Sequence, residues 1–505
     1  MKTTLLTLLA SLAIAVTPAV LNGREGSAVK ITELRSENSP LVTIRIALRA
    51  GSIHDPAGKE GLNALTATLI GSGGTQELTY AQVMEKLYPW AANISSQADH
   101  ELTTFTGDVH RDHLEAFYKL FTDLLLAPRF DSSDFARVKD LGINYLVNTL
   151  RSTDDEGLGK QALNAFLFEG HPYGTTEYGT VQGLTSITLD DVKGYFAKTY
   201  SRANLWVGIA GGYPAGFAER IRADFAKLPA GEPREVALPA PPAIGGMEVL
   251  VVQKPARAYA VSMGFPIAVT RKDKDFYALM VANSYFGEHR TFNGVLMNSI
   301  RGDRGMNYGD YSYIEKFTGG VSGTTFPNVN TPLRQQYFSI WLRPMPPAQA
   351  HFAIRNALFE LKRLVADGIS DADFEATRKF VTNYSKLWAA TANRRLGYLM
   401  DSEFYGTPYF IDRIEEELKT LTAADVNAAV KKYLTPENVK IAVVVDAGKG
   451  AEFFENMANN APSPITYEAP KPQNILDEDR IIGVFPMKVN RTKSRVVDAK
   501  DLFEK

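Results

Sequence analysis

The sequence predicts an α+β protein built from two copies of one unit. Residues 188–204 (TLDDVKGYFAKTYSRAN) align with residues 422–438 (TAADVNAAVKKYLTPEN) at a constant offset of 234 residues, 422 minus 188. Each copy opens with a threonine suited to capping a helix and continues into a stretch rich in β-branched residues. The proline-rich residues 238–246 (LPAPPAIGG) lie between the copies and are typical of an inter-domain linker. A chain of 505 residues also exceeds the usual size of one compact core, which agrees with a duplication.

The first copy begins with two predicted strands. Residues 30–34 and 42–50 alternate apolar and polar side chains, and the turn-forming residues 38–40 (NSP) separate them. A helix follows, because apolar residues recur from Leu62 at i, i+3, i+7 and i+8, and Gly71 ends it. The remaining elements expected in this copy are a helix from Thr79, a strand over 103–109, a helix over 112–126 and a helix from Ser132.

The second copy repeats this alternation of strands and helices. Residues 461–505, which follow it, are rich in Pro, Lys and Asp, and we expect this tail to lie over the surface. The elements expected in the second copy are strands over 249–252 and 260–265, a helix over 275–286 that Gly287 ends, helices over 347–363 and 371–392, and a strand from Val439.

The composition excludes several classes of function. Hydrophobic residues make up 45% and charged residues 22% of the chain, which is ordinary for a globular protein. A formal net charge of −2 gives no electrostatic reason to expect binding to nucleic acid or to an anionic membrane. The chain contains no cysteine, so it has no disulfide, thiolate metal site or cysteine nucleophile, and this composition suits an oxidising compartment.

The N-terminus resembles a secretory signal. Lys2 precedes the apolar run 5–16 (LLTLLASLAIAV), and small residues follow at 13–15 and 17–19, where a signal peptidase could cut. We therefore expect a signal peptide over residues 1–19 and a periplasmic or secreted protein; the alternative is a buried N-terminal helix. No later stretch approaches 18 uninterrupted apolar residues, so no membrane span is expected in the mature chain.

Around the first long helix the chain resembles a known family. Residues 51–62 (GSIHDPAGKEGL), the helix they open and the GGT of 73–75 are similar to the opening of the pitrilysin/insulinase zinc metallopeptidases. Members carry H-x-x-E-H on this helix and a further zinc-binding glutamate roughly 75 residues later. The HPYG at 171–174 resembles the same family. In this chain the two histidine positions are Ala64 and Thr68, the glutamate base position is Ala67, and the third ligand position is Asn144.

The resemblance implies a duplicated fold without a metal site of its own. None of the four replacing side chains offers an imidazole or a carboxylate, so no zinc or other cofactor is expected in this chain. The family's fold implies two homologous half-domains, each a mainly antiparallel sheet with helices packed on one face. The boundaries that follow are a signal peptide at 1–19, a first domain at 28–235, a linker at 236–247, a second domain at 248–460 and a C-terminal extension at 461–505.

Two residues of the second copy match a substrate-binding pair. In the family, an arginine and a tyrosine seven residues apart reach the substrate bound at zinc, and Arg301 and Tyr308 match them in type and spacing. A guanidinium and a phenol can both donate hydrogen bonds to a peptide carbonyl or a developing oxyanion. The alternative is that the arginine ends a helix and the tyrosine belongs to a strand, where they serve packing and solubility.

The resemblance therefore implies a non-catalytic subunit of a heterodimeric zinc metallopeptidase. In two-chain members one chain carries H-x-x-E-H and the other carries the arginine–tyrosine pair, and this chain fits the second description. Its expected partners are a zinc-bearing H-x-x-E-H subunit and an unfolded peptide. One alternative is a structural or chaperone-like peptide-binding subunit with no role in cleavage, and another is an independent enzyme with an unrecognised site.

Other patterns in the sequence are weaker candidates. His110 and His113, with Asp108 or Asp112, could hold a metal, but a solvated helix start explains them better. His171 is expected to be a turn histidine bonded to local backbone. Three further patterns lack the partners their chemistry needs, namely His100-Glu101, Glu288-His289 and the glycine-rich GGVSG from Gly319.

Overall fold

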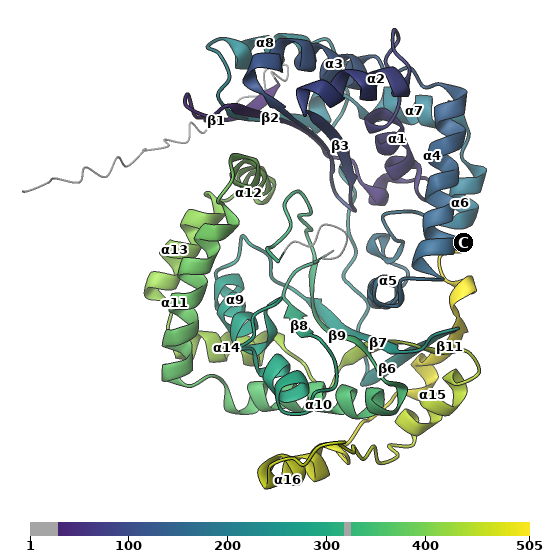
Figure 1. The fold of residues 1–505 in the computed structure, drawn as a ribbon, viewed down its shortest axis with the longest axis vertical. Helices are drawn as coiled ribbons and strands as arrows, with labels where there is room; N and C mark the ends of the chain where they lie inside the picture. Colours follow the sequence, from purple (N-terminus) through teal and green to yellow (C-terminus); the bar gives the residue numbers. More distant parts are fainter. Residues whose placement is uncertain (1–28, 318–324) are drawn as a thin grey trace, which may run out of the picture.

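The computed structural model describes residues 29–317 and 325–505, which form two β-sheets with helices around and between them (Figure 1). The predicted signal peptide at 1–19 and the glycine-rich residues 319–323 lie outside the described residues. In the described ranges, no helix combines the length and apolar character needed to cross a membrane.

The first sheet comes entirely from the first half of the chain. Its strands are β1 (Lys30–Arg35), β2 (Leu41–Leu48), β3 (Asn93–Ala98), β4 (Thr103–His110) and β5 (Leu205–Gly211), in the order β1-β5-β2-β4-β3. Only β1 and β5 are parallel; the other neighbours are antiparallel. The helices of this half are α1 (Leu62–Gly71), α2 (Tyr80–Leu87), α3 (Leu114–Leu126), α4 (Ser132–Asn144), α5 (Asp155–Leu167), α6 (Val181–Ser186), α7 (Leu189–Thr199) and α8 (Phe217–Phe225).

The second sheet repeats the strand order of the first. Its strands are β6 (Met247–Lys254), β7 (Tyr259–Ile267), β8 (Asp310–Tyr313), β9 (Gln336–Met345), β10 (Val439–Asp446) and β11 (Arg495–Asp498). The order is β11-β6-β10-β7-β9-β8, and without β11 it matches β1-β5-β2-β4-β3 strand for strand. The helices of this half are α9 (Lys274–Gly287), α10 (Pro347–Asp367), α11 (Asp371–Trp388), α12 (Ala392–Tyr405), α13 (Phe410–Thr420), α14 (Ala423–Tyr433), α15 (Gly450–Ala458) and α16 (Gln473–Ile482).

The internal repeat lies on corresponding helices of the two halves. Thr188 caps α7 and Thr422 caps α14, and each hydroxyl accepts a hydrogen bond from the N–H three residues on. In both helices the carboxylate of an aspartate at that third position accepts a hydrogen bond from the threonine N–H, which completes a capping box. The strands that follow, β5 and β10, occupy the same place in their sheets, so the predicted duplication is confirmed.

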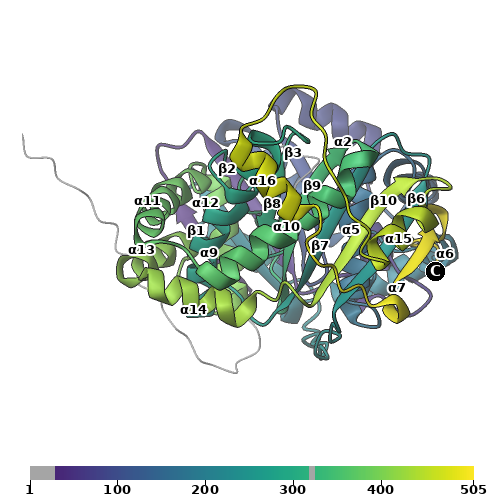
Figure 2. The same cartoon turned by 90° about the horizontal axis from the view of Figure 1, so that it is seen from below.

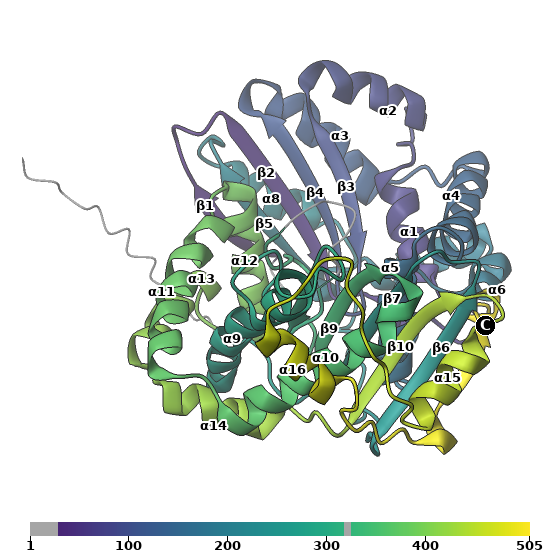
Figure 3. The same ribbon diagram turned by 60° about the horizontal axis from the view of Figure 1, so that its bottom comes forward.

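Each half covers one face of the other half's sheet. Helix α5 of the first half packs on β7 and β10, and α12 of the second half packs on β1 and β5. Figure 3 shows both helices between the two sheets. The prediction of helices on one face is therefore incomplete, because each sheet's second face is also covered, by a helix from the other half. This double burial explains why every residue of β5 (LWVGIAG) is buried.

The C-terminal tail joins the two halves. Its strand β11, whose residues are exposed or half-buried, lies at the edge of the second sheet, parallel to β6 and beside α15 (Figure 2). Beyond β11 the chain reaches the first half, where Arg151 Nε donates to the Leu502 carbonyl at 2.7 Å. The N–H of Val181 donates to the Phe503 carbonyl at 2.9 Å.

A buried ionic cluster also connects the halves. Lys316 Nζ from the second half lies 2.9 Å from Asp99 Oδ1 and 3.3 Å from Glu177 Oε1, both in the first half, and all three side chains are at most 5% exposed. Burial lowers the pKa of Lys316, but the two carboxylates raise it further, so the pKa stays above its usual value and the amine stays charged. Because the amine comes from the second half and both carboxylates come from the first, these ion pairs exist only while the two halves remain in contact.

Removal of the lysine should destabilise the whole chain. We expect Lys316→Ala to lower the free energy of unfolding by about 3–5 kcal/mol, because two buried carboxylates lose their counter-charge. Chemical denaturation of the full chain measures this. Lys379→Ala, at an exposed position of α11, is the control and should change the free energy by less than about 0.5 kcal/mol. A loss for Lys316→Ala no larger than in the control would show that the cluster does not stabilise the fold.

Candidate functional site

The helix that carries the family's zinc motif is well formed in this chain. The Asp55 carboxylate accepts hydrogen bonds from the N–H groups of Gly61 (2.8 Å) and Asn63 (2.7 Å), and so caps the start of α1. Burial raises the pKa of Asp55 to about 7, although these two donors oppose the shift. Gly61 has a φ of +101°, and a Cβ there would lie 2.8 Å from Leu184, so the turn into the helix requires glycine. The frame of the motif is intact.

The motif positions themselves carry no metal chemistry. Ala67 is 1% exposed. The Thr68 hydroxyl donates to the Ala64 carbonyl at 2.8 Å, a bond within its own helix. Asn144 ends α4, which packs against α1, and its side-chain oxygen accepts a hydrogen bond from Asn148 at 2.8 Å. The structure thus brings the two helices of the family's zinc site together, but they present methyl, hydroxyl and amide groups there.

The half-buried Arg301 forms a cluster with Tyr308 and a third residue, both of which are exposed. The Arg301 guanidinium carbon lies 5.7 Å from the centre of the Tyr308 ring and 5.6 Å from that of Phe292. Tyr308 is 78% and Phe292 is 66% exposed. No periodicity in the sequence indicated Phe292, whose exposure only the structure reveals. Arg301 belongs to a π-helical segment, Met297–Gly302, a rare conformation that is frequent at functional sites.

The polar groups of Arg301 and Tyr308 differ from those of the neighbouring Arg304 in their contacts. Within the described residues, neither the Arg301 guanidinium nor the Tyr308 hydroxyl forms a hydrogen bond or ion pair with the protein. Arg304, three residues on, is the opposite case. Its guanidinium is buried and bonds to Asp479 at 2.8 Å and to Glu478 at 2.7 Å, which fixes α16. Arg304 thus has a packing role, whereas Arg301, in the last turn of its helical segment as the alternative expects, contacts the rings of Phe292 and Tyr308.

A buried acid lies beside the pair. Asp310 is fully buried and accepts a hydrogen bond from Asn307 Nδ2 at 2.6 Å, while its other oxygen has no partner in the described part of the chain. Burial raises the pKa of Asp310 to about 8, and the nearby charge of Arg301 limits the shift. Burial thus favours the neutral form of Asp310, whereas the charge of Arg301 favours its ionised form.

The histidines set aside in the sequence have structural roles. His110 Nδ1 accepts a hydrogen bond from the Asp112 N–H at 3.3 Å, and His113 stacks on Trp90 with ring centres 6.1 Å apart. His171 Nδ1 accepts from the Tyr173 N–H at 3.0 Å, which confirms the turn histidine. His100 is fully buried, and burial lowers its pKa to about 3. Across the residues described, no three His, Cys, Asp or Glu side chains gather as metal ligands would.

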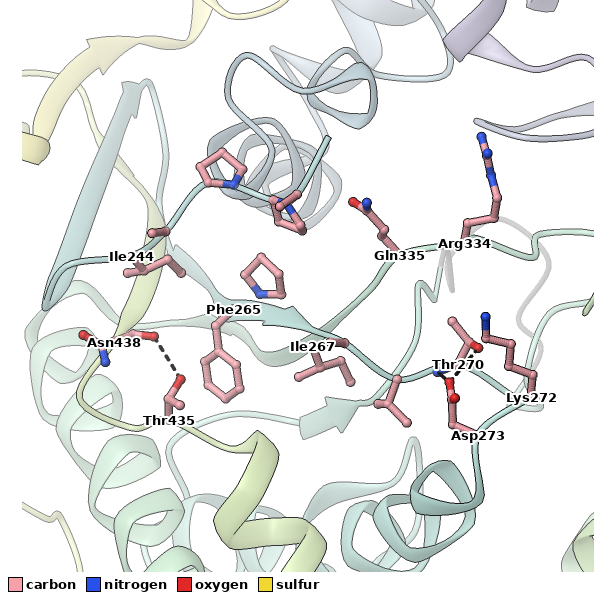
Figure 4. Close-up of a pocket in the computed structure, with 17 residues that line it drawn as sticks. Ile244, Phe265, Ile267, Thr270, Lys272, Asp273, Arg334, Gln335, Thr435 and Asn438 are labelled. Atoms are coloured by element: carbon pink, nitrogen blue, oxygen red, sulfur yellow. Dashed lines mark hydrogen bonds between the residues drawn. The ribbon is translucent and has the colours of Figure 1, made fainter. Parts of the chain in front are cut away.

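A groove of about 610 Å³ lies between the linker and β7 (Figure 4). Linker residues 240–244 form one wall, and residues 265–270, from the end of β7, form the other. Gln335 Nε2 donates to the Pro239 carbonyl at 2.8 Å and so holds the linker in place. β10 pairs with β7 only as far as Gly264, so the next residues of β7 have an unpaired edge on that side.

Comparison with known proteins identifies the family. The profile described as "Insulinase (Peptidase family M16)" matches residues 31–181, and the one described as "Peptidase M16 inactive domain" matches residues 186–381. The chain belongs to the M16 peptidase family, which confirms the resemblance to the insulinase-type enzymes. With its motif positions replaced, it is a member of the non-peptidase, inactive kind.

Individual relatives agree with this assignment. The protein named "Non-peptidase homolog YmxG" from Helicobacter pylori is 22% identical over 455 residues, which cover 89% of this chain and 100% of that protein. A probable mitochondrial-processing peptidase subunit beta from Arabidopsis thaliana is 24% identical over 219 residues, 42% of this chain and 40% of the relative.

Solved structures share the fold. The peptidase M16 inactive domain from Pseudomonas fluorescens superposes with a TM-score of 0.73 at 20% identity, and covers 83% of this chain and 96% of its own. A protease from Helicobacter pylori gives a TM-score of 0.70 at 15% identity, with 83% and 97% covered. These likenesses support the duplicated α+β fold.

The purified chain should bind no stoichiometric zinc, because the four motif positions lack ligands. Elemental analysis of protein dialysed against Zn²⁺ measures this, and we expect well under one zinc per chain. The double variant His110→Ala/His113→Ala is the control, and its zinc content should be the same. About one zinc per chain that this variant loses would contradict the prediction and restore the histidine pair as a site.

Proposed function

We propose that this chain is the non-catalytic subunit of a two-chain zinc metallopeptidase and supplies Arg301 and Tyr308 to its partner's active site. One observation carries the proposal: a half-buried guanidinium and an exposed phenol lie together, without hydrogen-bond or ion-pair partners among the described residues, in a chain whose own zinc positions are replaced. Unsatisfied donors at a surface are suited to an acceptor that another molecule brings.

The role of the pair is to hold a peptide bond in place. Both side chains can donate hydrogen bonds to the carbonyl oxygen of a peptide, and these bonds strengthen as negative charge develops on that oxygen. Zinc, its activated water and the glutamate base belong to the H-x-x-E-H partner in this proposal. The two donors of this chain would bind and orient the substrate. A named relative, the mitochondrial-processing peptidase subunit beta, is itself a subunit, which supports an assembly of chains.

An exposed strand edge supports the binding of an extended, unfolded peptide. β3 is the last strand of the first sheet, pairs only with β4, and carries the polar sequence NISSQA. Its outer backbone groups offer the hydrogen bonds that an added strand requires. We place the assembly in the periplasm or outside the cell, where the signal-like N-terminus would direct it.

A structural or chaperone-like peptide-binding subunit is the second candidate function. The groove between residues 240–244 and β7 favours it, because apolar walls and an unpaired strand edge suit an extended segment independently of cleavage (Figure 4). The first function requires Arg301 for peptide cleavage by the complex, whereas the second function does not. If Arg301 is not required, the second candidate stands.

Loss of either donor should slow cleavage by the assembled complex. We expect Arg301→Ala and Tyr308→Phe each to lower kcat/KM by about 10²–10³-fold, the usual effect of removing one donor to a developing oxyanion. Arg301→Lys should restore little, since an ammonium lacks the planar fork of a guanidinium. Peptide hydrolysis by the reconstituted pair measures this.

Controls separate catalysis from assembly. Arg257→Ala and Tyr88→Phe remove an exposed arginine and an exposed tyrosine elsewhere and should leave kcat/KM unchanged. The affinity for the partner chain should remain within a few-fold of the wild type in all variants. Full activity of Arg301→Ala would rule out the composite site.

The isolated chain should not hydrolyse peptides. Its motif positions supply neither zinc nor a base, so unfolded peptide substrates incubated with the chain alone should stay intact when followed by mass spectrometry. Hydrolysis that survives both further purification and a chelator would mean that the chain carries an independent catalytic site.

A further inference from the structure

The last helix of the chain is bonded to the segment that carries Arg301. This helix, α16, belongs to the tail that follows α15, and α15 follows β10 as α8 follows β5 in the first half. The tail therefore lies outside the duplicated unit. α16 packs on α10 (Figure 3), and α10 also contacts the π-helical segment Met297–Gly302. The tail and the segment thus share one supporting helix.

A buried arginine joins α16 directly to this segment. The Arg304 side chain is fully buried, with its Nε 2.8 Å from Asp479 Oδ1 and its Nη2 2.7 Å from Glu478 Oε2, both on α16. On the other side, its Nη1 donates to the Ser299 carbonyl at 2.7 Å and to the Ser299 hydroxyl at 3.1 Å. Ser299 lies two residues before Arg301, so one guanidinium ties the π-helical segment to the tail.

This bridge is charged and largely screened from water. Burial lowers the pKa of Arg304, but Glu478 and Asp479 raise it further, so the pKa lies above its usual value. The Asp479 side chain is 9% exposed, and its second oxygen accepts a hydrogen bond from the Tyr467 hydroxyl at 2.7 Å. Charge-assisted bonds of this kind are about twice as strong as neutral ones. They therefore restrict the movement of Arg304 and of the residues bonded to it.

The loop that follows the π-helical segment is held at both ends. At its start, the Lys471 ammonium of the tail donates to the Asp303 carbonyl. At its end, Tyr308 lies between Asn307 and Gly309, and the buried Asn307 side chain accepts a hydrogen bond from the Gly309 N–H at 3.1 Å. The tail thus fixes the end of the loop that is nearer to Arg301, and the loop itself fixes the end at Tyr308.

The Arg301 side chain depends on such support. Among the described residues its guanidinium contacts the rings of Phe292 and Tyr308 and forms no hydrogen bond or ion pair, so its direction depends strongly on the backbone that carries it. That backbone is π-helical, which is a rare conformation. A misplacement of about 1 Å at a reactive site can cost about a hundred-fold in rate, so side chains that orient a substrate need a rigid support.

We propose that α16 acts as a brace for the Arg301–Tyr308 pair, with Asp479 as a positioning residue that acts through Arg304. The purpose of the brace, to keep the pair oriented toward a bound peptide, rests on the proposed function. The brace itself rests on the bonds of Arg304 and is testable in this chain alone.

Hydrogen exchange of the full chain tests the brace. Asp479→Ala removes the partner of Arg304 Nε, and we expect the amides of residues 297–308 to exchange at least about ten-fold faster, the usual effect of losing one hydrogen bond to a charged group. Asp479→Asn keeps the shape and a neutral acceptor, and should give a smaller increase. Mass spectrometry of peptic fragments measures the rates. Unchanged exchange of residues 297–308 in Asp479→Ala would overturn the proposal.

A matched control lies on the same helix. Asp477 is exposed and bonds within α16, to Arg480 at 2.8 Å and to Gln473 at 2.9 Å. Asp477→Ala should therefore leave the exchange of residues 297–308 as in the wild type. The strands of the first sheet report on global unfolding, and their exchange should not change in any variant. Exchange that becomes faster throughout the chain in both Asp479 variants would show a general loss of stability and would also overturn the brace.

Peptide cleavage by the reconstituted pair shows whether the brace serves the site. Asp479→Ala should lower kcat by about ten- to a hundred-fold and change KM by less than about three-fold, because the substrate still binds while its donors are misplaced. Asp479→Asn should recover most of the rate, and Asp477→Ala should match the wild type. A raised KM with an unchanged kcat would contradict a positioning role.

The outcome is separable from that of the proposed function. If Asp479→Ala loosens residues 297–308 while Arg301→Ala leaves cleavage intact, the composite site fails and the brace stands. If Arg301→Ala abolishes cleavage while Asp479→Ala changes neither the exchange nor kcat, the composite site stands and the brace fails.

Discussion

The reciprocal cover of the two sheets constrains the rest of this structure. Each half of the chain folds a sheet whose inner face carries a helix from the other half, α5 on β7 and β10, and α12 on β1 and β5. Neither half can bury its own sheet on both faces without the other. The strands β5 and β10, which are buried along almost their whole length, depend on this arrangement.

Buried charges make the contact between halves specific. The Lys316 amine between Asp99 and Glu177 can be satisfied in one relative placement of the halves, whereas apolar packing alone tolerates sliding. The tail adds a second tie, since Arg151 of the first half bonds to the last residues of the chain. The surface between the sheets is thus held as rigidly as a protein core, which a site assembled from separate segments requires.

Within this frame, the corner at α1 and the corner at Arg301 differ in the polar groups that they offer. The cap on α1 formed by Asp55 is intact, although the helix offers Ala64 and Thr68 where zinc would be bound. Among the described residues, the Arg301 guanidinium forms no ion pair, whereas that of the nearby, buried Arg304 pairs with Asp479 and Glu478. Stability explains the second arginine. The first is half-buried and contacts only the rings of Phe292 and Tyr308 among the described residues, so its donors remain available to another molecule.

The sequence by itself determined the duplication, the type of most elements, the loss of the zinc ligands and the spacing of Arg301 and Tyr308. These features are local: capping boxes, apolar periodicity and short motifs involve residues within a few turns of one another. Only the tertiary structure decided that α5 and α12 each pack on the sheet of the other half. It also decided that the tail forms a strand and that Phe292 is exposed beside Arg301. It also decided the pairing of Lys316 with Asp99, 217 residues away. Such contacts join segments whose separation along the chain leaves no periodic signal, so they emerge only when the sheets have packed.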